Sequence, residues 1–133
     1  RMDSRVEVQA GICGFVTIAQ AHSDDNQHVT FSIESNCEKI KALGERLKSI
    51  GAVDAYAEIF PGGSSVLLSS ARETLSGCCA GCVVPVGLFK AMQVAAGLAL
   101  PKDVHISLAR NDSRSEWLLN FYVLDSPRVL LPW

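Results

Sequence analysis

The feature that most constrains the fold of this chain is a change in hydrophobic period near residue 36. Up to residue 34, apolar side chains alternate with polar ones, as at Val29, Phe31 and Ile33, a pattern typical of half-buried β-strands. After residue 37 they recur at helical spacing, first at Ile40 and Leu43. Strands followed by helices in one short chain predict an α+β fold.

The alternating segments predict an antiparallel sheet of about four strands, with helices packed on one face. A polar Ser-Asp-Asp-Asn turn at residues 23–26 favours hairpin pairing between its two neighbours. The expected strands cover residues 5–10, 15–21, 28–34 and 104–108.

Helix boundaries are predicted from capping residues. Ser35 or Asn36 can cap the first helix, and Glu38 completes a capping-box pattern with Ser35. Pro85 suits the first turn of a later, largely buried helix that ends before Pro101. The expected helices cover residues 38–50, 53–60 and 85–100, while residues 64–75 fit either a helix or a loop.

Cysteines mark the candidate site. Cys79 and Cys82 form a Cys-x-x-Cys pair just before a predicted helix, and such a pair needs two further ligands to close a tetrahedral metal site. Cys13, within a glycine turn, and Cys37, at a predicted helix start, are the candidates. The four thiols predict a site for zinc or an iron–sulfur cluster. Cys78 is left over and could replace Cys79 as a ligand.

The predicted surroundings of these cysteines favour thiolates. Helix N-termini and free backbone N–H groups stabilise negative charge, and the expected site has two helix starts and a glycine turn. Four thiolate ligands leave no coordination position for water. A metal bound there would therefore be structural or electron-carrying rather than hydrolytic, and it would add to folding stability.

Two other functions and one plainly structural role compete with the metal site. A Cys-x-x-Cys pair at a helix start can also cycle through a disulfide, so Cys79 and Cys82 could serve a thiol–disulfide redox protein. The chain could be a non-catalytic scaffold or interaction domain. Free cysteines are also common core residues. No catalytic residue is assigned, and whether the chain is an enzyme stays open.

The composition indicates which partners and which cellular compartment to expect. With a formal net charge of −2, the chain has no excess positive charge to attract nucleic acid. It contains no uninterrupted run of 18 apolar residues, so we expect no membrane span. Five cysteines are an odd number, and the chain lacks a basic and apolar leader at its start. We therefore expect the reducing cytoplasm, and we expect Arg1, which precedes Met2, to be left over from cloning.

Two regions are expected along the chain: residues 1–110 as one α+β domain with the cysteine cluster, and residues 111–133 as a C-terminal extension. The extension is apolar and aromatic, so it either makes a homo-oligomer contact, packs on the domain, or is not native. The remaining polar residues are expected to be ordinary solvated side chains; they include Glu7, His22, His28, Glu34, Asp54, Glu58 and His105.

Four stretches of the sequence together resemble a family of small uncharacterised bacterial and archaeal proteins, mostly from anaerobes. They are AGICGF at residues 10–15, SNC at 35–37, CVVP at 82–85 and AAGLALPKDV at 95–104. The resemblance covers roughly residues 6–106 and implies no established activity. It implies cysteines matching Cys13, Cys37 and Cys82, with His or Cys matching Cys79. A metal ligand tolerates that exchange, whereas a redox disulfide does not. This chain departs from the pattern at Val83, where a proline is expected, and in having Cys78 and the tail.

Overall fold

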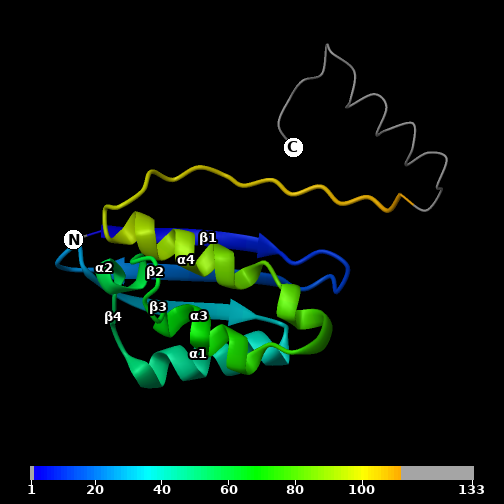
Figure 1. Ribbon diagram of the computed structural model, residues 1–133, viewed down its shortest axis with the longest axis horizontal. Coiled ribbons are helices and arrows are strands. Elements are labelled where there is room, and N and C mark those ends of the chain that lie inside the picture. Colours follow the sequence, from blue (N-terminus) through cyan, green and yellow to red (C-terminus); the bar gives the residue numbers. More distant parts are fainter. Residues whose placement is uncertain (1, 112–133) are drawn as a thin grey trace, which may run out of the picture. The chain divides into compact units, whose positions relative to one another are not determined.

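The computed structural model describes residues 2–111, which fall into two units, residues 1–102 and the segment from residue 103 onward. The first unit holds all of the regular secondary structure in the described residues. It combines a four-stranded antiparallel sheet with helices, so the predicted α+β class is confirmed (Figure 1).

The sheet is a meander in which each strand pairs with the next along the chain, in the order β1-β2-β3-β4. The strands are β1 (Met2–Gln9), β2 (Val16–Ser23), β3 (His28–Ser35) and β4 (Val53–Asp54). Gln9 pairs with Val16, and Thr17 pairs with Ser35. The end of β1, the start of β2 and the end of β3 therefore share one end of the sheet.

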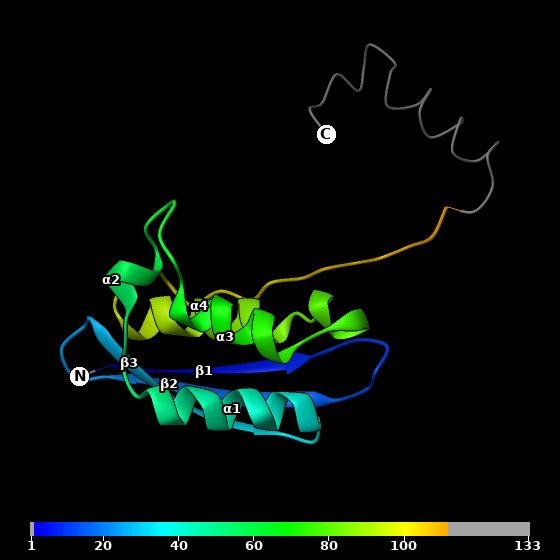
Figure 2. The ribbon, with the colours of Figure 1, turned by 60° about the horizontal axis from the view of Figure 1, so that its bottom comes forward.

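The helices cover one face of this sheet. Alternate residues of β2 are buried, among them Thr17, Ala19 and Ala21, while Gln20 between them is exposed. Helix α4 contacts β1 and β2, α1 contacts β3, and α3 contacts both α1 and α4 (Figures 1 and 2). The helical elements are α1 (Glu38–Ile50), α2 (Ala55–Glu58), α3 (Val66–Thr74), the 3₁₀-helix η1 (Gly77–Gly81) and α4 (Val84–Ala95).

The hydrophobic core lies between the sheet and this helical layer. α1 contributes side chains at its predicted spacing, and α4 contributes the apolar residues expected of a buried helix. The backbone of α1 lies close to β3 at Gly44, where an added Cβ would contact the Ile33 side chain at 3.4 Å. The largest fully buried apolar residues are Val29, Ile40, Leu43, Leu67, Val84, Leu88 and Met92.

Two sequence-based predictions about secondary structure are wrong. The fourth strand is β4, formed within residues 53–60, where a helix was expected throughout; only Ala55–Glu58 is helical. Residues 104–108 form no strand and are exposed. Alternation describes which face a side chain takes, but a strand also needs a neighbour for its backbone hydrogen bonds.

Helix ends also differ from the expected positions. Cys37, rather than Ser35 or Asn36, is the N-cap of α1, and no side-chain cap bond forms. α4 ends at Ala95 rather than near residue 100, because the N–H of Leu98 donates to the Gln93 carbonyl and the chain reverses. Residues 64–75, which were ambiguous, contain α3.

In the second unit, the described residues 103–111 have no helix or strand, and His105 is exposed and hydrogen-bonds Ser107. Almost all of the expected C-terminal extension lies outside the described residues. By length and composition alone, Gly77–Ala95 could cross a membrane. That stretch is η1 followed by α4 rather than one helix, and α4 packs against β1 and β2.

Candidate metal centre

Three segments that are distant in the sequence meet at one end of the sheet. The turn between β1 and β2 carries Cys13, and the junction between β3 and α1 carries Cys37. The strand register places both at the same end. The start of α4 joins them, because Gly87 lies over Val8 near the end of β1. The β1–β2 turn, the start of α1 and η1 share the right-hand end of Figure 1.

Cys13 lies in a tight turn. The N–H of Gly14 donates to the Gly11 carbonyl at 2.9 Å, and the N–H of Ala10 donates to the Phe15 carbonyl at 3.1 Å. Gly11 and Gly14 both have positive φ, which glycine adopts without a steric cost. The Cys13 side chain is exposed.

Cys37 is held by its backbone. Its N–H donates to Ser35 Oγ at 3.1 Å, and Ser35 Oγ also accepts a hydrogen bond from the buried hydroxyl of Thr17 at 2.9 Å. Its carbonyl accepts from the N–H of Lys41, closing the first turn of α1. Cys37 therefore immediately precedes a helix start, as predicted.

Cys79 and Cys82 are fixed by η1. The N–H of Cys79 donates to the Ser76 carbonyl, and the N–H of Cys82 donates to the Cys79 carbonyl, both at 3.1 Å. Lys39 of α1 reaches across to the Ser76 carbonyl at 3.4 Å and joins this segment to the first turn of α1. Cys82 then lies two residues before the start of α4, whose N-terminus favours negative charge.

The electrostatics of Cys82 report on its neighbours. Burial raises the pKa of the Cys82 thiol, the backbone N–H of Val84 lowers it, and negative charge on Cys13, Cys37 and Cys79 raises it. The net shift is upward. The three other predicted ligands therefore all lie within electrostatic reach of Cys82, although they come from three separate segments.

The thiols gather without forming a completed metal site. All five cysteines are free, and within residues 2–111 no group of three or more His, Cys, Asp or Glu side chains is arranged to hold a metal ion. Cys37, Cys79 and Cys82 are partly buried and pack against the hydrophobic core. Cys78 is exposed, and its charge is not among those that act on Cys82.

Comparison with known proteins places the chain in a family. The model of a family of unknown function, DUF6951, matches residues 4–108. The chain belongs to DUF6951. The matched residues of this DUF6951 member include all five cysteines and every described helix and most of every strand. No curated protein and no solved structure matches the chain.

One residue expected at the surface has a buried role in this DUF6951 chain. Glu58 was expected to be a surface charge, but it is 6% exposed, and its Oε1 accepts the N–H of Leu67 at 2.8 Å. Its Oε2 has no hydrogen-bond partner in the described part of the chain. The bond spans nine residues across a glycine-rich loop, so no local sequence pattern indicates it.

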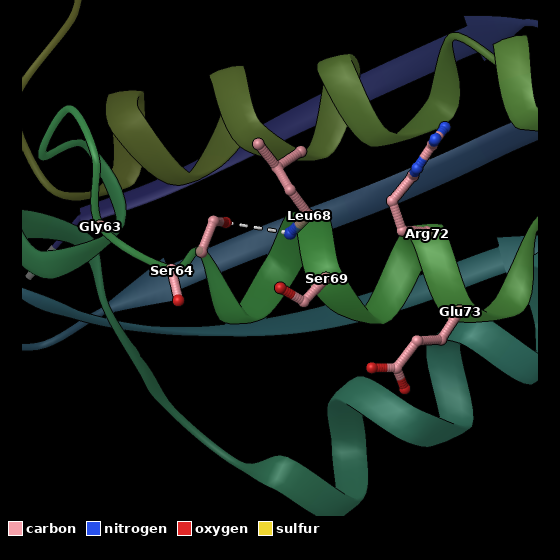
Figure 3. Close-up of a pocket in the computed structure, with 7 residues that line it drawn as sticks. Gly63, Ser64, Leu68, Ser69, Arg72 and Glu73 are labelled. Carbon is pink, nitrogen blue, oxygen red and sulfur yellow. Dashed lines mark hydrogen bonds between the residues drawn. The ribbon is translucent and has the colours of Figure 1, made fainter.

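A shallow depression of about 450 Å³ lies beside α3, away from the cysteines. The hydroxyl of Ser65 caps α3 by accepting the N–H of Leu68 at 3.0 Å (Figure 3). Arg72 and Glu73 project from α3 in different directions, and Glu73 pairs with Arg46 of α1. The Gly-Gly-Ser-Ser loop at residues 62–65 thus leads directly into the N-terminal cap of α3.

The histidines near the hairpin contact carboxylates rather than each other. His22 hydrogen-bonds Asp3 and Asp24, and His28 hydrogen-bonds Asp25 at 2.7 Å. The hydrogen bond to Asp3 raises the pKa of His22, and the one to Asp25 raises the pKa of His28. All three contacts are exposed to solvent: those of His22 link β2 to β1 and to the β2–β3 turn, and that of His28 links β3 to the same turn.

Proposed function

We propose that this chain is a metal-binding protein in which Cys13, Cys37, Cys79 and Cys82 together hold zinc or an iron–sulfur cluster. The observation that carries the proposal is that the β1–β2 turn, the start of α1 and η1, which hold these four cysteines, meet at one end of the sheet. Chance burial of single cysteines gives no reason for three separate segments to bring their thiols to one place. The donor set suits both groups, since each is commonly held by four cysteine thiolates.

The surroundings of the thiols support this proposal. Cys37 and Cys82 each lie at a helix start, and the Val84 N–H is directed to the Cys82 thiol. Such groups offset the negative charge that accumulates on four thiolates. Binding requires the thiol side chains to turn toward a common centre, so the metal would tie together the β1–β2 turn, α1 and α4 and stabilise the fold.

The redox alternative has less support. The motif lies within η1 and its C-cap, and helix α3 precedes it in the chain, whereas a strand precedes the motif in thioredoxin-like proteins. A disulfide between Cys79 and Cys82 would leave Cys13 and Cys37 without a role.

Several expectations accompany the proposal. We expect other members of the family to have cysteines matching Cys13, Cys37 and Cys82, with Cys or His matching Cys79, and to come from bacteria and archaea. We expect the protein in the cytoplasm, where thiols stay reduced, and without nucleic-acid or membrane partners. Residues 111–133 would then contribute a homo-oligomer contact.

The test is anaerobic purification of the full chain, with a visible spectrum and metal and sulfide analysis of the same sample. Brown protein with stoichiometric iron and sulfide indicates a cluster, and colourless protein with one zinc per chain indicates a structural site. Serine variants of the four ligands should each lose metal, and Cys78→Ser is the matched control that should keep it. Wild-type protein without metal would refute the proposal.

A further inference from the structure

Strand β1 lies at the edge of the sheet, and one of its two sides is unpaired. Within residues 2–111 it pairs with β2 from Met2 to Gln9 and with no other strand. An unpaired edge offers its backbone N–H and C=O groups to another strand, and proteins often block such an edge with proline, lysine or a bulge. β1 contains neither of these residues, and its register with β2 is uninterrupted.

The hairpin shows which residues of β1 offer their backbone groups to the free edge. The N–H of Ala10 donates to the Phe15 carbonyl across the β1–β2 turn. In an antiparallel ladder, the backbone groups of successive residues point alternately to the two sides of the strand. The even-numbered residues of β1 therefore bond to β2, and the odd-numbered residues, which include Arg5 and Glu7, direct their N–H and C=O groups to the free edge.

The side chains of β1 are divided between the two faces of the sheet. Ser4 Oγ donates to the Ala91 carbonyl of α4 at 2.6 Å, and Val6 packs against the hydrophobic core. Because successive side chains of a strand point to opposite faces, Arg5 and Glu7 lie on the face that the helices leave open. Both side chains are exposed there, and they form an ion pair at 3.5 Å.

We propose that β1 is a dimerisation strand, and that the β1 strands of two copies of this chain pair antiparallel about a twofold axis at Val6. In this register Arg5 of each copy lies directly opposite Glu7 of the other copy. An axis at Arg5 would bring the two Arg5 side chains together, and an axis at Glu7 would do the same for Glu7. Like charges directly opposite each other destabilise a strand pair, whereas opposite charges stabilise it. Charge complementarity therefore favours a second copy as the occupant of this edge and the axis at Val6.

The backbone and the inner face fit the same register. Arg5 and Glu7 both direct their backbone groups to the free edge, so as opposite residues they can form a hydrogen-bonded pair that exchanges two N–H···O bonds. On the inner face the two Val6 side chains would meet, and each is only partly buried in a single copy. Because a twofold contact uses the same strand of both copies, the assembly closes as a dimer with one continuous sheet. The inference does not depend on a metal at the cysteines.

Sedimentation equilibrium of the full chain tests this inference. A phosphine reductant is present, so that exposed Cys13 and Cys78 form no intermolecular disulfide. The wild-type chain should show a monomer–dimer equilibrium. Arg5→Glu alone and Glu7→Arg alone each place like charges opposite each other, and each should raise the dimer Kd at least about tenfold.

Charge exchange separates a lost contact from a damaged fold. The double variant Arg5→Glu/Glu7→Arg and an equimolar mixture of the two single variants both bring opposite charges together again, so both should dimerise as tightly as the wild type. Glu34→Arg is the matched control, because it reverses an exposed charge on β3, away from the β1 edge, and it should leave the Kd unchanged.

Hydrogen exchange then tests which strand pairs. Protection of the Arg5 and Glu7 amides should rise with protein concentration, because their N–H groups are bonded only in the dimer. Protection that is independent of concentration would show that another segment of the same chain covers β1, and it would overturn the inference. A chain that stays monomeric at sub-millimolar concentration would also overturn it, as would a dimer whose Kd is unchanged in both single variants.

Discussion

Gly87 of α4 lies directly against Val8 of β1: a Cβ at position 87 would come within 2.7 Å of Val8 Cγ2 and 3.4 Å of Val6 Cγ2. Real Cβ atoms do not approach other atoms as closely as the first of these distances, so only glycine lets the helix lie this close to the strand. Because α4 begins at Val84, this contact also sets how near Cys82 comes to the end of β1.

Replacing Gly87 by alanine should destabilise the fold. Overpacking costs about 1–3 kcal/mol, and the better helix propensity of alanine returns at most about 1 kcal/mol. We expect the free energy of unfolding to fall by about 1–2 kcal/mol in urea titrations. Gly81→Ala is the control, since a Cβ there meets nothing within 4 Å. Equal or greater stability of Gly87→Ala would show that α4 can move away from β1 at no cost.

Ser35 joins Thr17 to the backbone of Cys37 through a single oxygen. Ser35→Ala should leave the buried Thr17 hydroxyl and the Cys37 N–H without that partner, at a cost of about 1–3 kcal/mol. Ser32→Ala, an exposed position on the same strand, is the matched control and should change stability little. Chemical denaturation of both variants measures the difference, and equal effects would argue against a specific role for Ser35.

Glu58 caps α3 from a buried position. Glu58→Ala removes the acceptor of the Leu67 N–H and should cost about 1–3 kcal/mol of stability. Glu58→Gln keeps an oxygen for that bond and should cost less. Urea unfolding of the two variants ranks them. If both lose the same stability, the carboxylate itself, rather than its hydrogen bond, would be what the fold requires.

The two histidines near the hairpin, His22 and His28, should make the stability of the fold depend on pH. Asp3 raises the pKa of His22 above its ordinary 6.5, and Asp25 does the same for His28. Their stabilising contributions are therefore complete below pH 6.5 and are lost as the pH rises through the folded pKa values. Imidazole NMR titrations should give midpoints above 6.5, and Asp3→Asn should lower that of His22 alone. Midpoints at or below 6.5 would contradict this account.

Asp25 makes the stability of the same hairpin depend on pH in the acidic range. The backbone N–H and the ring of His28 hold the pKa of the Asp25 carboxyl far below its ordinary 3.8. Its contribution is present above pH 3.8 and is lost as the pH falls further. Together these groups place the greatest stability of the hairpin between pH 3.8 and 6.5.

The hydrophobic periodicity of the sequence correctly predicted the longer strands and the first helix. The three long strands and α1 follow from alternation and from helical spacing, and Pro85 correctly indicated the start of α4. β4 was missed because a two-residue strand has no period. Residues 104–108 were predicted as a strand because alternation carries no information about a pairing partner.

The candidate site was predictable in part. The sequence placed Cys37 and Cys82 at helix starts, and both lie there. Whether Cys13 would come near them depended on the register between β1, β2 and β3, which no local pattern specifies. The contrast between exposed Cys13 and the partly buried Cys37 depends on packing across the whole end of the sheet.

The most direct test of the central claim is X-ray absorption at the metal edge of the anaerobically purified, wild-type protein. The account predicts a shell of four sulfur atoms, at about 2.3 Å for zinc, with an additional iron–iron distance if a cluster is bound. A shell of nitrogen and oxygen atoms, or fewer than three sulfurs, would contradict the assignment of Cys13, Cys37, Cys79 and Cys82 as the ligands.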